Sequence, residues 1–356
     1  MKLIELHILQ SFPVSCLNRD DVGSPKSALF GGTKRARISS QCLKRASRIT
    51  AASDSTGFEG IRSRHLKEPF ISALLNEQLS DDEANVFANE LCTVFSKQDP
   101  KNENQVTTAV YLSPAEIKGM AVAIKENIED IRTLTDDKKT AAAIKKVAKD
   151  AAKAATRNDA ADIALFGRMV ANDPNLNIDG AAMFSHALST HRADNEVDFF
   201  SAVDDRKGDA EDAGAGMIGT LEFNSATYYR YAAINLDLLA DDKHLGGLSE
   251  DERKDILRAF IKAVLTAVPG ARKNSMSAAT LPHEVLGIRK GSGQPLQLIN
   301  AFEKPVRANG SGFADASLET MKNHLADIEK TWGDQGKKTY LTEDGLDTFL
   351  DNLLSD

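Results

Sequence analysis

A long segment of the sequence, from about Thr56 to Asp179, is mostly helical in period. Strand patterns lie on both sides of it: polar and apolar residues alternate from Lys2 to Ile8, and Thr220 to Leu236 reads as a strand. At about 150 residues per domain, the 356 residues allow about two units, either separate or as one core with large insertions. The pattern therefore predicts a chain in which a large helical part is flanked by strands.

The N-terminal segment loosely resembles a signal peptide, but its polar residues argue against one. Glu5, His7 and Gln10 interrupt the apolar stretch, and a secretory core does not tolerate a carboxylate at its centre. We predict an internal, half-buried first strand instead. Elsewhere no apolar run approaches the roughly 18 residues that a membrane span needs, so we expect no membrane association. The three cysteines are odd in number and widely spaced, which fits neither a disulfide framework nor a zinc site and favours a reducing cytoplasm.

The charge is distributed unevenly. The net charge is −8, yet the first fifty residues hold nine Lys or Arg against three acids. A cluster of cations without an intervening acid comprises Lys34, Arg35, Arg37, Lys44, Arg45 and Arg48. A focused cation cluster on an acidic body suits selective binding of a polyanion, because the rest of the surface repels nucleic acid.

Local signals place this cluster on a defined frame. Gly31 and Gly32 indicate a turn, Arg37 a strand end, and Ser39 and Ser40 the N-cap of a helix that starts near Gln41 and runs past Ile49. A helix start favours an anion, and Lys44, Arg45 and Arg48 project from one side of its next turns. The alternative is a basic helix face that only contacts solvent.

Other candidate sites are weak. Residues 214–219 match the dinucleotide fingerprint G-x-G-x-x-G, but they follow an acidic tract and lead into a strand, so a hairpin tip is expected there. The chain has no P-loop motif and no G-x-S-x-G elbow. His186 and His191 are five residues apart and lack the zinc-hydrolase pattern. Asp20 and Asp21 could hold Mg²⁺ for phosphodiester cleavage, although adjacent loop carboxylates are more often solvated.

Aromatic residues are concentrated in a short stretch. Six of the 21 aromatic residues fall within 33 positions, namely Phe199, Phe200, Phe223, Tyr228, Tyr229 and Tyr231. Unpaired bases stack on exposed aromatic side chains, so a protruding hairpin could wedge between nucleotides. Alternatively, the three tyrosines pack into the core of a strand.

Two helices are marked by their sequences. Ser249 and Glu252 form a capping box ahead of an apolar stripe, which predicts a core helix that Pro269-Gly270 stops. The stretch from Asp136 to Arg157 is rich in alanine and lysine. We expect that helix to bury little area and to project from the body, with its lysines either solvated or touching a polyanion.

Several blocks of sequence, in one order, resemble the CasC family, the repeated backbone subunit of the type I-E CRISPR surveillance complex Cascade. The resemblance spans nearly the whole chain and is carried by residues 15–21, 28–32, 37–45, 162–169, 179–182, 202–205, 219–220, 222–223, 229–231, 268–271 and 300–303.

The resemblance implies an α+β fold: an RRM-like (ferredoxin-like) palm made of residues 1–55 and 180–356, a helical finger insertion at 56–179, and a β-hairpin thumb at 196–224. It also implies a soluble, cytoplasmic RNA-binding protein without enzymatic activity, metal or cofactor. Its partners would be CRISPR RNA, target DNA through the guide, further copies of itself in a filament, and other Cascade subunits.

The resemblance also assigns site residues. Those expected along the RNA backbone are Arg19, Gly31, Gly32, Lys34, Arg35, Arg37, Ser39, Ser40, Gln41, Lys44, Arg45 and Arg48. Those expected beside a displaced base are Met169, Phe200, Val203 and Ile218. Two alternatives remain: a metal-dependent RNA endonuclease that uses Asp20 or Asp21, as in related type III complexes, and a general single-strand-binding module.

Overall fold

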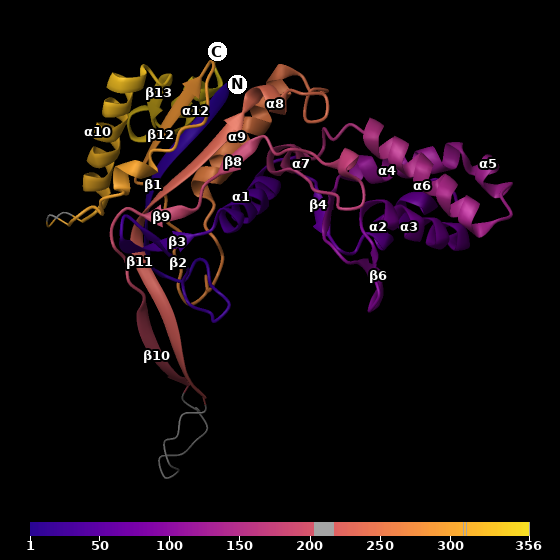
Figure 1. Cartoon of the computed structure of the whole chain (residues 1–356), viewed down its shortest axis with the longest axis horizontal. Helices are drawn as coiled ribbons and strands as arrows, with labels where there is room; N and C mark the ends of the chain where they lie inside the picture. The colour runs from indigo at the N-terminus through magenta and orange to yellow at the C-terminus, as the bar shows by residue number, and fades with distance from the viewer. Residues whose placement is uncertain (203–216, 309, 311, 356) are drawn as a thin grey trace, which may run out of the picture. The chain divides into compact units, whose positions relative to one another are not determined.

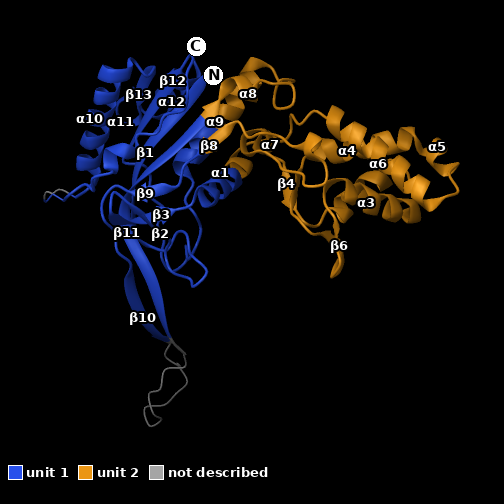
Figure 2. Ribbon diagram, viewed as in Figure 1, with its two compact units in different colours: residues 1–50, 184–233, 260–356 blue, residues 51–183, 234–259 orange. Residues whose placement is uncertain are grey.

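The computed structural model describes residues 1–202, 217–308, 310 and 312–355. The chain divides into two compact units, each described by itself (Figures 1 and 2). Unit 1 comprises residues 1–50, 184–233 and 260–356, and unit 2 comprises residues 51–183 and 234–259. The segment expected as a helical insertion, 56–179, falls within unit 2. The predicted RRM-like palm stays a prediction.

A sheet forms the body of unit 1, and the order of its strands differs from their order in the sequence. Within the described residues its strands follow the order β13-β12-β1-β11-β9-β3-β2, with β8 and β10 also paired to β11. Their bounds are β1 Leu3–Ser15, β2 Ser27–Phe30, β3 Thr33–Ile38, β8 Ala182–Phe184, β9 Ala187–Ser189, β10 Glu196–Ala202, β11 Met217–Asn235, β12 Glu284–Lys290 and β13 Lys337–Tyr340. Strands from both ends of the chain meet, since Leu3 pairs with Lys290 and Leu9 with Glu284.

Helices cover this sheet. Their bounds are α1 Ser40–Asp54, α9 Glu250–Thr266, η2 Ile299–Phe302, α10 Ala314–Trp332, α11 Leu341–Asp344 and α12 Leu346–Leu354. Phe349 and Leu353 of α12 pack so closely on Gly287 of β12 that a side chain there would clash with them. The predicted capping box of α9 is confirmed, because the Ser249 hydroxyl accepts from the Glu252 amide and the Glu252 carboxylate accepts from the Ser249 amide.

Unit 2 is built mainly of helices around its own apolar core. Its elements are β4 Ile61–Ser63, α2 Lys67–Asn76, α3 Asp81–Phe95, β5 Gln98–Asp99, β6 Asn102–Val106, β7 Val110–Leu112, α4 Pro114–Glu126, α5 Ile128–Arg132, α6 Asp137–Ala154, α7 Ala161–Phe166, η1 Pro174–Leu176 and α8 Leu236–Leu239. Ser80 and Ser113 each open a helix with a full capping box.

The alanine- and lysine-rich helix does not project as predicted. Ile144, Ala148 and Ala152 of α6 are fully buried in the core of unit 2, where α6 packs on α3 and α4. Small alanine side chains let the helices approach closely, so a helix with little apolar area can still be an inner one. Lys145 and Lys149 pair with Glu90 and Asp173 at its sides.

The first strand differs from the half-buried strand that the alternation predicted. Every residue from Leu3 to Gln10 is buried, because both faces of β1 are covered. Its polar residues are paired instead of solvated: Glu5 forms an ion pair with Lys290 at 2.7 Å and accepts from the Tyr231 hydroxyl at 2.7 Å. His7 Nδ1 lies 2.9 Å from the Tyr229 hydroxyl. Buried polar groups with partners of this kind fix the register of a strand.

No helix in the described part of the chain is long and apolar enough to cross a membrane.

The burial of His7 predicts a pH dependence of stability. Burial, together with the charge of Lys290, lowers the pKa of His7 from 6.5 to about 3. Below pH 6.5 the unfolded chain therefore takes up a proton that the folded chain refuses, and stability is lost as the pH falls. Between pH 7 and 5.5 this group should lower the free energy of unfolding by about 1 kcal/mol.

Urea denaturation of the wild type and of His7→Asn at both pH values measures this effect. The wild type should lose about 1 kcal/mol more than the variant, and the other histidines cancel in the comparison. Equal losses in the two proteins would mean that His7 is not held neutral by the fold.

Candidate nucleic-acid interface

The glycine turn joins two strands of unit 1 and depends on both glycines. β2 and β3 pair antiparallel, with Leu29 opposite Lys34 and Phe30 opposite Thr33. Gly31 and Gly32 between them have φ values of +57° and +70°, a region that favours glycine. A Cβ on Gly31 would lie 1.7 Å from the carbonyl oxygen of Glu303, whereas a Cβ on Gly32 would meet nothing within 4 Å. Gly31 thus lets the turn pack directly on the segment after η2.

Arg35 holds this packing together from inside. Its side chain is fully buried, and its Nη1 donates to the carbonyls of Ser189 and Thr190 at 3.0 and 2.9 Å. Its Nη2 donates to those of Phe302 and Glu303 at 2.8 and 3.2 Å. This placement differs from the expected contact with RNA, because the guanidinium donates its hydrogen bonds to backbone carbonyls of unit 1.

The start of α1 is also engaged within unit 1. The Ser39 hydroxyl accepts from the Cys42 amide at 3.3 Å, so Ser39 caps the helix as the sequence predicts. The Ser39 amide donates to Oδ1 of Asn18 at 2.8 Å, and the Ser40 amide donates to Nδ1 of His186 at 3.0 Å. An anion at this helix start would meet donors that already have partners, which weakens the prediction of a bare phosphate site there.

The remaining cations of the cluster are accessible in varying degree. Arg45 is exposed, and Lys34, Arg37, Lys44 and Arg48 are half-buried. The ammonium of Lys44 lies 5.8 Å from the centre of the Phe184 ring, and burial lowers the pKa of Lys44 from its ordinary value. Arg37 Nε donates to the Ser27 carbonyl at 3.3 Å.

A hollow of about 870 Å³ in unit 1 extends this cationic surface. Arg19 and the exposed Arg45 line it, as does Lys273 from the segment after α9. Residues 268–271 also line it. Sequence reasoning missed Lys273 because nothing local links residue 273 to residue 45. The signal that could have found it is the block at 268–271, which stands immediately before it.

Two aspartates, Asp20 and Asp21, also line the hollow. Oδ1 of Asp20 accepts from the amides of Val22 and Ser24 at 3.1 and 2.9 Å, so this carboxylate caps its own loop. In the described ranges no group of three or more His, Cys, Asp or Glu is placed to hold a metal ion.

The hairpin β10–β11 extends from the sheet of unit 1 (Figure 1). The ring of Phe200 covers Gly219 on the paired strand, where a Cβ would lie 2.6 Å from the ring. Val197 and Phe199, two apart on β10, are 65% and 63% exposed. Val203, the side chain of Ile218 and most of the glycine fingerprint lie outside the described residues.

The aromatic stretch thus splits in two. Tyr228, Tyr229 and Tyr231 are buried in the sheet, as the alternative interpretation held. Phe199 is the most exposed aromatic residue described on the hairpin, and sequence reasoning did not single it out from its neighbours.

Met169 belongs to unit 2, where a rigid frame presents it. Its side chain is 73% exposed. On one side of it, Arg168 and Ile178 exchange two backbone hydrogen bonds of 2.9 Å, and on the other the Val170 amide donates to Oδ1 of Asn177 at 2.7 Å. An exposed apolar side chain on a fixed backbone suits contact with a ligand.

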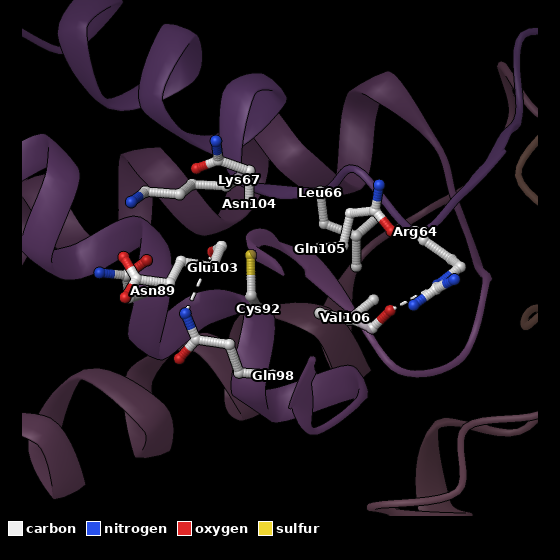
Figure 3. Close-up of a pocket in the computed structure, with 10 residues that line it drawn as sticks. All are labelled: Arg64, Leu66, Lys67, Asn89, Cys92, Gln98, Glu103, Asn104, Gln105 and Val106. Atoms are coloured by element: carbon white, nitrogen blue, oxygen red, sulfur yellow. Dashed lines mark hydrogen bonds between the residues drawn. The ribbon is translucent and has the colours of Figure 1, made fainter. Parts of the chain in front are cut away.

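Unit 2 also contains a small pocket around Cys92 (Figure 3). Its volume of about 10 Å³ holds no more than a water molecule. Burial raises the pKa of Cys92 to about 12, so the thiol is unreactive.

The fold and these surfaces describe a protein of mixed helix and sheet with a cationic hollow and an extended hairpin on the sheet of unit 1. Over residues 4–352 the sequence matches the CT1975-like family, and the chain belongs to it. No curated protein matches the chain.

Two solved structures are similar. A chain of a "CRISPR RNA-guided surveillance complex, pre-nicking" is 28% identical with a TM-score of 0.76, and the match covers 95% of this chain and 91% of that one. A chain of a "CRISPR RNA-guided surveillance complex" shares the fold, with 24% identity, a TM-score of 0.59 and coverage of 95% and 88%.

The glycine turn yields a test of its packing. Gly31→Ala and Gly32→Ala introduce the same strain at positive φ, about 1 kcal/mol each. Only the first drives a methyl group into the Glu303 carbonyl. We expect Gly31→Ala to lower the free energy of unfolding by about 3 kcal/mol or more, and Gly32→Ala by about 1 kcal/mol. Urea denaturation measures both, and equal losses would contradict the contact.

Proposed function

We propose that the chain is a CRISPR RNA-binding backbone subunit of a type I-E surveillance complex. It lies in several copies along the guide RNA and supports pairing of the guide with target DNA in antiviral defence. The observation that carries the proposal is the cationic hollow of unit 1, in a chain that matches a subunit of an RNA-guided complex over 95% of its length.

In the proposed complex, different cations contact different parts of the RNA backbone. Arg45, Arg19 and Lys273 line the hollow, where a strand of RNA brings closely spaced phosphates. Lys34 and Arg37 on β3, with Lys44 and Arg48 on α1, extend the track beyond it. Arg35 supports this surface from below and contacts no phosphate in the proposed complex.

The hairpin and Met169 would act on the bases. In the proposed filament, a displaced base is flanked by Met169 and by three apolar residues of one copy, namely Phe200, Val203 and Ile218. Phe199, with its exposed ring beside Val197, adds an apolar surface on which a base can stack.

Two alternatives make different predictions. A general single-strand-binding protein would copurify with RNA of mixed lengths, whereas the proposed subunit retains small RNA of uniform length. Gel analysis of the nucleic acid bound to the purified protein separates the two.

Removing two cations of the track tests the phosphate contact. Lys44→Ala/Arg45→Ala should weaken binding of single-stranded RNA for all sequences and reduce the slope of log K against log salt by up to about 1.4, since each contact contributes about 0.7. Lys262→Ala/Lys330→Ala removes two exposed lysines of unit 1 outside the hollow and should change neither quantity. Titrations at several salt concentrations measure this. A loss that depends on RNA sequence would contradict a role in binding phosphates.

The second alternative, a metal-dependent endonuclease, predicts cleavage. Because Asp20 is engaged by its own loop, we expect the protein with Mg²⁺ or Mn²⁺ to leave bound and target RNA intact. Denaturing gels of end-labelled RNA are the measurement. Cuts at regular spacing that disappear in Asp20→Ala or Asp21→Ala would establish the nuclease instead.

A further inference from the structure

A second cationic hollow lies in unit 2, separate from the surface discussed above. It has a volume of about 380 Å³. Three cations line it, Lys153 at the end of α6, Arg157 just after it and Lys243 after α8, together with the amides of Asn175 and Asn177. No Asp or Glu is among its lining residues.

Arg157, one of the cations that line the hollow, also belongs to a buried group of charges. Glu116 Oε1 accepts from Nε of Arg157 at 2.6 Å, and both Glu116 oxygens accept from Nη1 of Arg168 at 2.8 Å. These three side chains are at most 6% exposed, and the described ion pairs give the two guanidiniums this one carboxylate. Arg168 Nη2 is buried without a hydrogen-bond partner among the described residues.

Three lysines on one side of α6 differ in whether a carboxylate pairs with them. Lys145, Lys149 and Lys153 follow one another at spacings of four along one side of the helix. The first pairs with Glu90 at 2.9 Å and the second with Asp173 at 3.2 Å. For Lys153, which reaches the hollow, the described residues supply no ion pair.

The loop that carries Lys243 is fixed in place. His244 Nε2 lies 2.7 Å from the Asp179 carbonyl, and Gly247 packs against Asn158, where a Cβ would be 2.9 Å from Nδ2. Oδ1 of Asp241 accepts from the Lys243 amide at 2.9 Å, which fixes the backbone at Lys243. The cations therefore face one hollow from three segments that are held together.

We infer that this hollow binds a phosphate group. The two ammonium groups of Lys153 and Lys243, beside Arg157 and Asn177, line a space of this size and match the oxygens of a phosphate, which accept hydrogen bonds from several directions. The phosphate belongs either to the backbone of a nucleic acid strand or to a free phosphate, and the two sources are separated by experiment. The site is independent of the RNA track of unit 1.

Hydrogen exchange of the intact protein tests the inference, with inorganic phosphate and a single-stranded DNA oligonucleotide as separate probes at constant ionic strength. At least one probe should slow exchange at residues 175–178 and 241–245. Protection by inorganic phosphate identifies a free-anion site, and protection by the oligonucleotide alone identifies a strand contact. No protection by either probe would overturn the inference.

Two double variants test whether the protection from hydrogen exchange arises at the hollow. Lys153→Ala/Lys243→Ala should abolish the protection. Lys139→Ala/Lys146→Ala removes two exposed lysines of the same helix outside the hollow and should retain it. Equal loss in both variants would show a general effect of charge and would also overturn the inference. Because the proposed RNA track is unchanged in these variants, RNA binding to unit 1 is scored separately.

Discussion

The surface of unit 1 depends on one buried guanidinium. Arg35 binds backbone carbonyls of three chain segments, namely the glycine turn at Phe30, the strand end at Ser189–Thr190 and the segment at Phe302–Glu303. Hydrogen bonds from a charged group are worth about 1.5 to 3 kcal/mol each, and an unsatisfied carbonyl left behind is penalised. The positions of Lys34 and Arg37 on β3 depend on this anchor, since β3 cannot shift without breaking these hydrogen bonds.

The two units use buried charge in different ways. In unit 1, Glu5 and Lys290 form an ion pair within the sheet, and the buried guanidinium of Arg35 donates to backbone carbonyls. In unit 2, the guanidiniums of Arg157 and Arg168 share Glu116, and Arg157 also lines a hollow with further cations. Buried polar groups with fixed partners specify one arrangement of the segments that carry them.

Local signals in the sequence predicted local structure well. The Gly31-Gly32 turn, the cap at Ser39 and the capping box at Ser249 are all present, because each depends on residues within a few positions. The burial of Arg35 was not predictable, since the four carbonyls that its Nη1 and Nη2 bond lie more than 150 residues away. Lys273 escaped notice for the same reason. The helix α6 was misjudged because alanine content reports apolar area and not how closely neighbours can approach.

The order of the strands has a consequence for synthesis on the ribosome. β1 is synthesised first, yet its partner β12 begins at Glu284. β3 can pair with β9 only after Ala187 has been synthesised. Most of unit 2, residues 51–183, is contiguous and can fold while the rest is translated. β1 and the free edge of β3 in the β2–β3 hairpin then remain unpaired and open to other chains. The cationic surface is completed only when the last third of the chain arrives, so an incomplete chain cannot display it.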